Sequence, residues 1–109
     1  MTVEELLKAL PWKAVTVPDS TREITGGYCG DLLSWVMGRA ESGDCWLTIM
    51  SNKNVVAVAQ LTDVACVVFT EGVLPDEEMI RTAEAHDINL IACEETTFAA
   101  SVKVAELLK

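Results

Sequence analysis

Histidine and basic residues are scarce in this chain of 109 residues. His86 is the only histidine, and the four cysteines form no C-x-x-C pair, so the usual spacings of zinc and iron–sulfur sites are absent. Eight basic residues stand against 17 acidic ones, giving a formal net charge of −9, which disfavours binding to a nucleic-acid backbone. We therefore expect no metal centre and no nucleic-acid partner. With its one histidine in a helical segment, the chain also lacks a Ser-His-Asp or Cys-His arrangement, so we expect no enzyme.

Long apolar runs are also missing. A transmembrane helix needs about 18 or more apolar residues, and the longest apolar region, 55–69, is interrupted by Gln60, Thr62 and Asp63. The first ten residues are acidic and amphipathic and lack the basic start and cleavage site of a signal peptide. These features predict a cytoplasmic protein that has no contact with a membrane.

The composition favours a single folded domain over residues 1–109. Half of the residues are hydrophobic, which argues against intrinsic disorder. The apolar pattern predicts helices over residues 2–10, 28–40, 55–65, 75–87 and 98–109. It predicts strands over residues 13–17, 45–50, 66–70 and 88–92. Alternating strands and helices imply a three-layer α/β/α sandwich with a mostly parallel central sheet of about four strands.

Several helix starts carry capping signals. Thr2 and Glu5 have the spacing of a capping box, and Thr96 or Thr97 is expected to cap the last helix. The segment 55–65 is ambiguous, because its valines favour a strand but its apolar residues do not alternate. We favour a helix there with Asn54 as its N-cap, since it would connect two parallel strands.

The carboxyl ends of parallel strands are where ligands bind in open α/β sheets. The predicted loops at that edge are 18–28, 51–54, 70–75 and 93–97, and the first contains "TGGYCGD" between a strand and a helix. Backbone N–H groups of Gly26 and Gly27, with the Thr25 hydroxyl, can cradle a phosphate in such a turn. The alternative is a tight loop in which Gly30 permits close helix packing. The Walker and dinucleotide spacings are both absent.

The "SNKN" turn at 51–54 is expected on the same face, where Lys53 would offset a phosphate held near Gly26 and Gly27. An ordinary solvated turn is the alternative. The candidate site therefore consists of two groups of residues: Thr25, Gly26, Gly27 and Tyr28, and Ser51, Asn52, Lys53 and Asn54. The expected ligand is a nucleotide or another anionic metabolite rather than a resident cofactor.

Residues 22–37, "REITGGYCGDLLSWVM", and the segment that follows resemble the DRTGG domain family over nearly the whole chain. The motif of that family, Asp-Arg-Thr-Gly-Gly, is represented here by Glu23, Ile24, Thr25, Gly26 and Gly27, so its Arg is missing. DRTGG domains are similar to the N-terminal domain of HPr kinase/phosphorylase. They occur as accessory modules in phosphotransacetylases, beside CBS domains and in the regulatory inserts of family II pyrophosphatases.

The resemblance implies a non-catalytic regulatory module that forms a homodimer, with a small anionic metabolite and a partner enzyme as the candidate partners. Two hypotheses remain open: a module that senses a small anionic metabolite, and an assembly module without a small ligand. A small phosphotransferase is the least favoured reading.

The remaining distinctive residues have mostly structural interpretations. Cys45 and Cys66 lie in apolar strands and are expected in the core, whereas Cys29 and Cys93 lie near loops, where a thiol can be reactive. We expect His86 at a helix C-terminus. Among the tryptophans, Trp35 is the one expected at a subunit contact.

Overall fold

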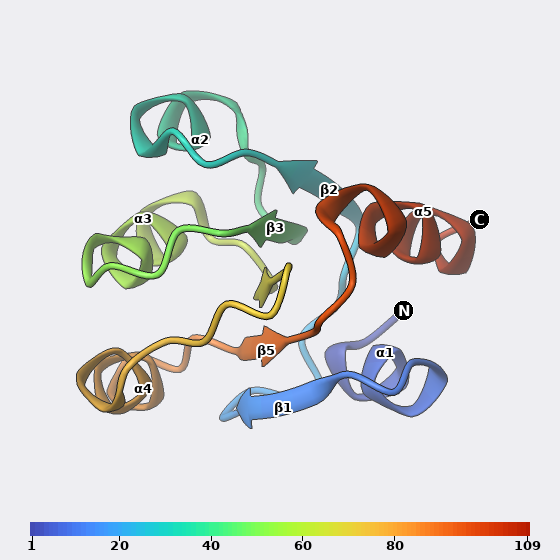
Figure 1. Cartoon of the computed structure of the whole chain (residues 1–109), viewed down its shortest axis with the longest axis horizontal. Helices are drawn as coiled ribbons and strands as arrows, with labels where there is room; N and C mark the ends of the chain where they lie inside the picture. The colour runs from blue at the N-terminus through green and yellow to red at the C-terminus, as the bar shows by residue number, and fades with distance from the viewer.

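The computed structural model describes residues 1–109, which form one five-stranded sheet with helices on both faces (Figure 1). In chain order the elements are α1 (Val3–Ala9), β1 (Lys13–Thr16), β2 (Gly26–Cys29), α2 (Leu33–Arg39), β3 (Asp44–Thr48), α3 (Asn54–Thr62), β4 (Cys66–Phe69), α4 (Glu77–Ala85), β5 (Leu90–Ala92) and α5 (Thr97–Leu107). The predicted three-layer α/β/α fold is confirmed. The sheet has five strands, one more than expected.

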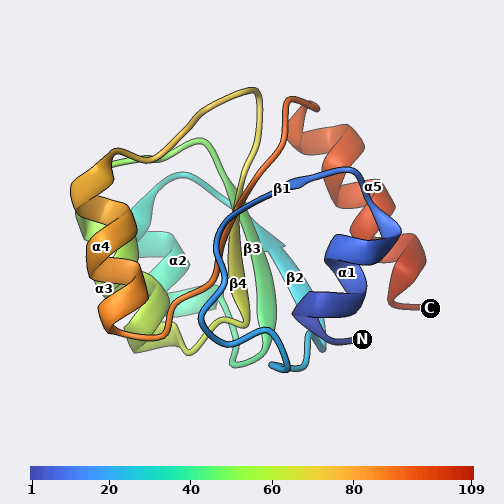
Figure 2. The same cartoon turned by 90° about the horizontal axis from the view of Figure 1, so that it is seen from below.

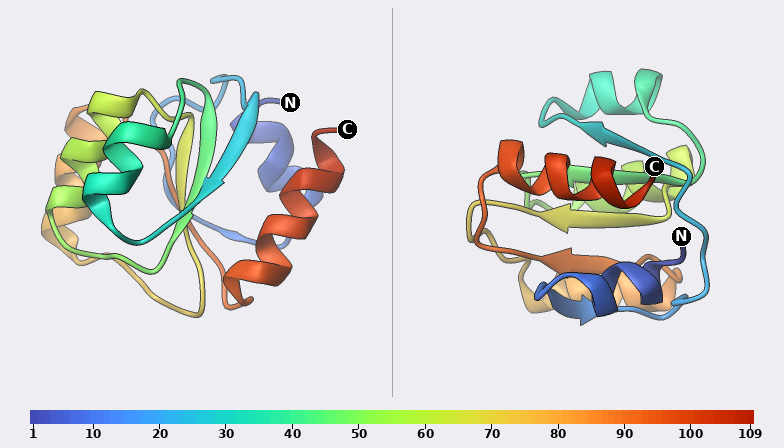
Figure 3. Two further views of the ribbon diagram at one scale, coloured as in Figure 1. Left: turned by 90° about the horizontal axis from the view of Figure 1, so that it is seen from above. Right: turned by 90° about the vertical axis from the view of Figure 1, so that its right-hand side faces the viewer.

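The sheet has the strand order β1-β5-β4-β3-β2. Strands β2 to β5 are parallel, and β1 is antiparallel to β5. Helices α2, α3 and α4 lie on one face of the sheet, whereas α1 and α5 lie on the other (Figure 2). The chain therefore changes face after β5, and α5 returns over β2 and β3 (Figure 3). No helix is long and apolar enough to cross a membrane.

The sheet separates two hydrophobic clusters. One packs Trp46 and Phe69 against α2, α3 and α4, and the other packs β-strand residues against α1 and α5. Every residue of the central strands β3 and β4 is buried, as expected for parallel strands covered on both faces. Cys45 and Cys66 are fully buried, so their predicted place in the core is confirmed.

Most of the predicted helix ends are confirmed. Thr2 and Glu5 form the capping box of α1, and the Thr96 hydroxyl accepts a hydrogen bond from the Ala99 N–H at the start of α5. The cap predicted for α3 is wrong. Asn54 is the first helical residue, and its N–H donates to the side chain of Asn52 at 2.9 Å. The side chain that accepts a backbone hydrogen bond at this end of α3 is therefore that of Asn52, two residues before Asn54.

Residues 26–29 were expected in a loop and the start of a helix, and this prediction is wrong. They form β2, an edge strand paired with β3, and α2 begins only at Leu33. A Cβ atom on Gly26 would lie 2.7 Å from a carboxylate oxygen of Asp44. A Cβ atom on Gly30 would lie 2.7 Å from the ring of Tyr28. These glycines therefore make room for neighbouring side chains.

Candidate functional site

The two groups of residues predicted as one site do not come together in the structure. Gly26 pairs with Asp44 at the start of β3, so Thr25 and Gly26 are at the amino edge. The 51–54 turn follows the end of β3 and lies at the carboxyl edge. A four-residue strand spans about 13 Å, so Lys53 cannot offset an anion held at Gly26. The expectation that the 18–28 loop lies at the carboxyl edge is wrong for these glycines.

Within each group the residues have local roles. The Thr25 N–H donates to the Gly43 carbonyl at 2.9 Å, which joins the start of β2 to the turn before β3. Tyr28 packs against the hydrophobic cluster that contains α2. Ser51 is half-buried, and Asn52, Lys53 and Asn54 are exposed. Whether any of the eight residues contacts a ligand stays a prediction.

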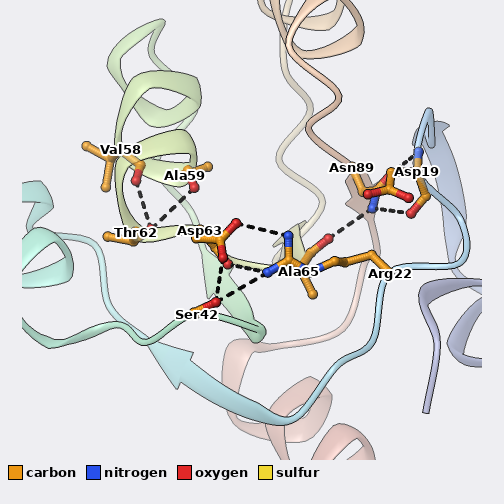
Figure 4. A network of polar contacts seen from close by, with 9 residues as sticks. All are labelled: Asp19, Arg22, Ser42, Val58, Ala59, Thr62, Asp63, Ala65 and Asn89. Atoms are coloured by element: carbon orange, nitrogen blue, oxygen red, sulfur yellow. Dashed lines mark hydrogen bonds and ion pairs between the residues drawn. The ribbon is translucent and has the colours of Figure 1, made fainter.

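The amino edge carries a network centred on Arg22 (Figure 4). The guanidinium donates to the Asp63 carboxylate at 3.0 Å and to the Asp63 carbonyl at 2.8 Å. The Ser42 hydroxyl also donates to this carboxylate. The hydrogen bonds from Arg22 and Ser42 hold the pKa of Asp63 below its usual value. Arg22 therefore ties the segment before β2 to the end of α3.

Asn89 extends these contacts into the protein interior. Its amide donates to the carbonyls of Asp19 and Ala65 at 2.8 and 2.9 Å, and its oxygen accepts from the Asp19 N–H at 3.0 Å (Figure 4). The side chain is buried, with 2% exposed. A cavity of only about 190 Å³ remains at this edge, and His86 lines it. The predicted position of His86 at a helix C-terminus is confirmed.

The carboxyl edge has a larger opening. After β4 the chain continues to α4 on one face, and after β5 it continues to α5 on the opposite face, as Figure 2 shows. A cavity of about 660 Å³ lies between these diverging loops and the segment that enters β1. Its lining comprises Pro11, Trp12, Lys13, Gly72, Val73, Leu74, Ala92, Cys93, Glu94, Glu95 and Lys103. We call this space the carboxyl-edge cavity.

Glu95 is the fixed polar group of the carboxyl-edge cavity. One carboxylate oxygen accepts a hydrogen bond from the Trp12 indole N–H at 2.6 Å, and the other lies 2.7 Å from the Lys103 ammonium. The hydrogen bonds from Lys103 and Trp12 lower the pKa of Glu95, so the carboxyl group is ionised at neutral pH. Because an ammonium carries three N–H donors, Lys103 keeps donors for a ligand.

The wall formed by the loop after β4 is fastened to the loop after β5. Glu71 and Gly72 have φ angles of 60° and 78°. Their N–H groups donate to the carbonyls of Glu95 and Cys93 at 2.8 and 3.0 Å. The Glu71 carboxylate also accepts a hydrogen bond from the Thr97 N–H at 3.0 Å. The two loops and the start of α5 thus form one connected unit around the cavity.

The cavity combines apolar walls with charges of both signs. Val73 and Leu74 supply apolar surface, Lys13 and Lys103 supply positive charge, and the carboxylate of Glu95 is already paired. Cys93, which was expected near a loop as a candidate reactive thiol, is buried, and burial raises its pKa. A protonated thiol is a poor nucleophile, so the arrangement favours binding over covalent chemistry.

The sequence identified two of the loops that form this cavity. Both 70–75 and 93–97 were predicted at the carboxyl edge, and both contribute lining residues. Trp12 is buried and lines the cavity, which the sequence did not indicate. It reaches this edge because β1 runs antiparallel to β5, with Lys13 opposite Ala92. A single antiparallel edge strand was not apparent from the sequence.

Comparisons with known proteins place the fold. No protein-family model matches the chain, and no curated protein matches it. A solved structure of the CBS and DRTGG domains of the regulatory region of Clostridium perfringens pyrophosphatase, complexed with its activator diadenosine tetraphosphate, matches with a TM-score of 0.72. The sequence identity is 17%, and the match covers 93% of this chain and 44% of that chain. This protein therefore shares its fold with part of the CBS and DRTGG regulatory region of a pyrophosphatase.

Proposed function

We propose that this protein is a non-catalytic, cytoplasmic regulatory module that binds a nucleotide or another small anionic metabolite in the carboxyl-edge cavity. The observation that carries the proposal is the cavity itself, which opens where the loops after β4 and β5 diverge. Ligand sites of α/β sheets occupy such crevices, and a volume of about 660 Å³ suits a drug-sized molecule. The likeness in fold to a regulatory region that binds a dinucleotide activator supports the same class of function.

The cavity offers contacts for both parts of a nucleotide. Lys13 and Lys103 suit phosphate oxygens, whereas Val73 and Leu74 suit the face of a base. Lys53 lies at the same edge, beyond the end of the neighbouring strand β3, and would extend the phosphate contacts of a long ligand. Thr25, Gly26 and Gly27 form a separate candidate site at the opposite end of β2, with backbone amides as its donors.

The module would act on a partner enzyme through α5. This helix supplies Lys103 to the cavity, and its first N–H group is held by Glu71 from the loop after β4. A ligand that changes the Lys103–Glu95 contact would therefore act on the position of α5, which lies over β2 and β3. The second candidate function is assembly of two copies without a small ligand, and the exposed apolar side chains of α2 and α5 favour it.

A thermal-shift screen tests the ligand proposal. The panel contains adenine and guanine nucleotides, diadenosine tetraphosphate and acetyl phosphate, each with and without magnesium. A ligand at about 100 times its Kd stabilises by about 2.7 kcal/mol, which raises Tm by roughly 10 °C for a domain of this size. Removing a phosphate contact weakens binding, so Lys13→Met and Lys103→Met should each show a smaller rise in Tm with ligand. The rise is measured against the Tm of the same variant without ligand.

Matched controls separate the possible sites. Lys8→Met removes an exposed lysine of α1 that lies outside the cavity lining, and it should leave the shift unchanged. Gly27→Val tests the glycine site. A ligand-induced rise in Tm that is lost only in this variant would assign the binding site to β2. A screen without any shift would contradict the sensing function and favour assembly.

A further inference from the structure

The two outer strands of the sheet, β1 and β2, differ in their protection against pairing with a further strand. The edge strand β1 carries Lys13, and Pro11 and Pro18 flank it, which are common devices that block edge-to-edge association. The opposite edge strand, β2, has the sequence Gly-Gly-Tyr-Cys, with no charge and no proline. It pairs with β3 on one side only. Its outer N–H and C=O groups are therefore open to another strand.

The elements around β2 are almost uncharged. Together, β2, α2 and α5 contain one acidic residue, Glu106, and two basic residues, Arg39 and Lys103, in a chain with 17 acidic residues. By contrast, the nine residues of α4 alone include Glu77, Glu78 and Glu84. Depletion of charge is a feature of the centres of protein interfaces.

Exposed apolar side chains concentrate on the same elements. Nine large apolar side chains are exposed in the chain, and six of them belong to α5, α2 or the N-cap of α2: Leu32, Trp35, Met37, Phe98, Val102 and Leu107. The helices α2 and α5 cover opposite faces of the sheet near β2 (Figure 3). The two helices that flank the strand edge therefore both carry exposed apolar side chains.

A groove between β2 and α5 completes this surface. Because Gly27 has no side chain, a space of about 330 Å³ remains between Gly27 and Cys29 of β2 and Val102 and Ala105 of α5. Most of its lining is hydrophobic. Side chains of a second strand and helix laid along this edge would have room to pack there.

We propose that two copies of this chain associate through their β2 edges, around a two-fold axis that makes the two β2 strands antiparallel and the two sheets continuous. In this arrangement α5 faces α5 of the second copy, and α2 faces its counterpart. A partner for this surface must offer an unpaired strand edge flanked by apolar, nearly uncharged helices. The same surface of a second copy meets each requirement. The inference rests on the β2 edge, so it is independent of a ligand in the carboxyl-edge cavity.

The area that a stable dimer interface needs predicts which elements contribute to it. A stable interface buries about 800 Å² on each partner, more than a four-residue strand provides, so the helices must contribute. A negative charge on either helix should then separate the subunits. Val102→Glu and Trp35→Glu alter side chains that are 40% and 53% exposed, so neither leaves a cavity in the core.

Light scattering coupled to size-exclusion chromatography measures the mass directly. We expect the native chain to elute as a dimer at about 50 μM, and Val102→Glu and Trp35→Glu to raise its Kd at least tenfold, roughly 1.4 kcal/mol or more. Leu61→Glu is the matched control, because Leu61 is 72% exposed on α3, outside these elements, and this variant should remain dimeric. A monomeric native chain, or a dimer that tolerates both substitutions, would overturn the proposal.

Cys29 provides a second measurement on the unmodified chain. It is the exposed cysteine of β2, whereas Cys45, Cys66 and Cys93 are buried. Its thiol is partly desolvated in the groove beside α5, which raises its pKa, so alkylation is followed at mildly alkaline pH. We expect slow labelling of Cys29 in the dimer and faster labelling on dilution. A labelling rate that does not change with concentration would place the subunit contact elsewhere.

Discussion

The two ends of the parallel strands use polar residues in different ways. At the amino edge, Arg22, Ser42 and Asp63 bond to one another, and Asn89 bonds to the backbone of two loops. About 190 Å³ of cavity remains there. At the carboxyl edge, Glu95 bonds to Trp12 and Lys103, yet a cavity of about 660 Å³ remains beside them.

The difference follows from the connections of the chain. At the amino edge, the segment between β1 and β2 passes across the starts of the strands, and Arg22 and Asn89 bond it to the rest of the molecule. At the carboxyl edge, α4 and α5 leave on opposite faces, so no segment fills the space between their loops. Polar contacts therefore close one edge, whereas at the other they lie beside an open cavity. Substitutions at the first edge should change stability, and those at the second should change affinity.

The largest effect on stability is expected at Asn89. Asn89→Ala removes three hydrogen bonds and leaves the Ala65 carbonyl without its side-chain donor in a buried site. This should lower the free energy of unfolding by about 2–3 kcal/mol, measured by urea denaturation. Ligand affinity should stay within a factor of two of the native value. A loss of affinity larger than the change in stability would contradict the division between the two edges.

The adjacent glycines of β2 should differ from each other. In Gly26→Ala the new methyl group would lie 2.7 Å from an Asp44 carboxylate oxygen, which costs about 1–2 kcal/mol of overpacking. In Gly27→Ala its closest contact is the Cys45 carbonyl oxygen at 3.6 Å, so stability should be unchanged or rise by up to about 1 kcal/mol. Thermal unfolding of both variants checks this. Equal losses would mean that both glycines are needed for their backbone conformation.

These glycines also show where interpretation of the sequence reaches its limit. Apolar periodicity identified the buried strands and most helices correctly, because β4 is apolar throughout, β3 has the apolar centre Cys45–Leu47, and the capping residues act locally. The strand β2 was missed, because the close approach of Gly26 to the Asp44 side chain is formed only in the folded protein. The cavity was predicted only in part. Its loops 70–75 and 93–97 follow from the alternation of strands and helices, whereas Trp12 reaches the cavity through the antiparallel pairing of β1, which the sequence did not indicate.

The ion pair of Arg22 should have a modest effect. Arg22 and Asp63 have 29% and 61% of their side chains exposed, so Arg22→Met should lower the free energy of unfolding by only about 0.5–1 kcal/mol. Arg22→Lys should recover part of this loss, since a lysine cannot bond to the carboxylate and the carbonyl in the same planar geometry. Urea denaturation at low and high salt measures both. A loss above about 2 kcal/mol would assign this pair a larger role than its exposure allows.

The smallest effect is the pH dependence of the same pair. The folded pKa of Asp63 is lowered by Arg22 and Ser42, so its stabilising contribution is present above the unfolded pKa and is lost as pH falls through the folded value. Tm of the native chain should therefore fall more between pH 5 and 3 than Tm of Arg22→Met. Parallel curves would show that the Arg22–Asp63 contact does not form in solution.

The central claim is that the carboxyl edge holds the ligand, and two-dimensional ¹H–¹⁵N NMR with added adenosine triphosphate tests it most directly. We predict that the Trp12 indole N–H and the amides of residues 72–74 and 93–95 shift in a saturable way, while the amides of residues 25–28 and 63 do not. Saturable shifts confined to residues 25–28 would place the site at the glycines of β2. A spectrum unchanged by the nucleotide and by the rest of the ligand panel would contradict a sensing function.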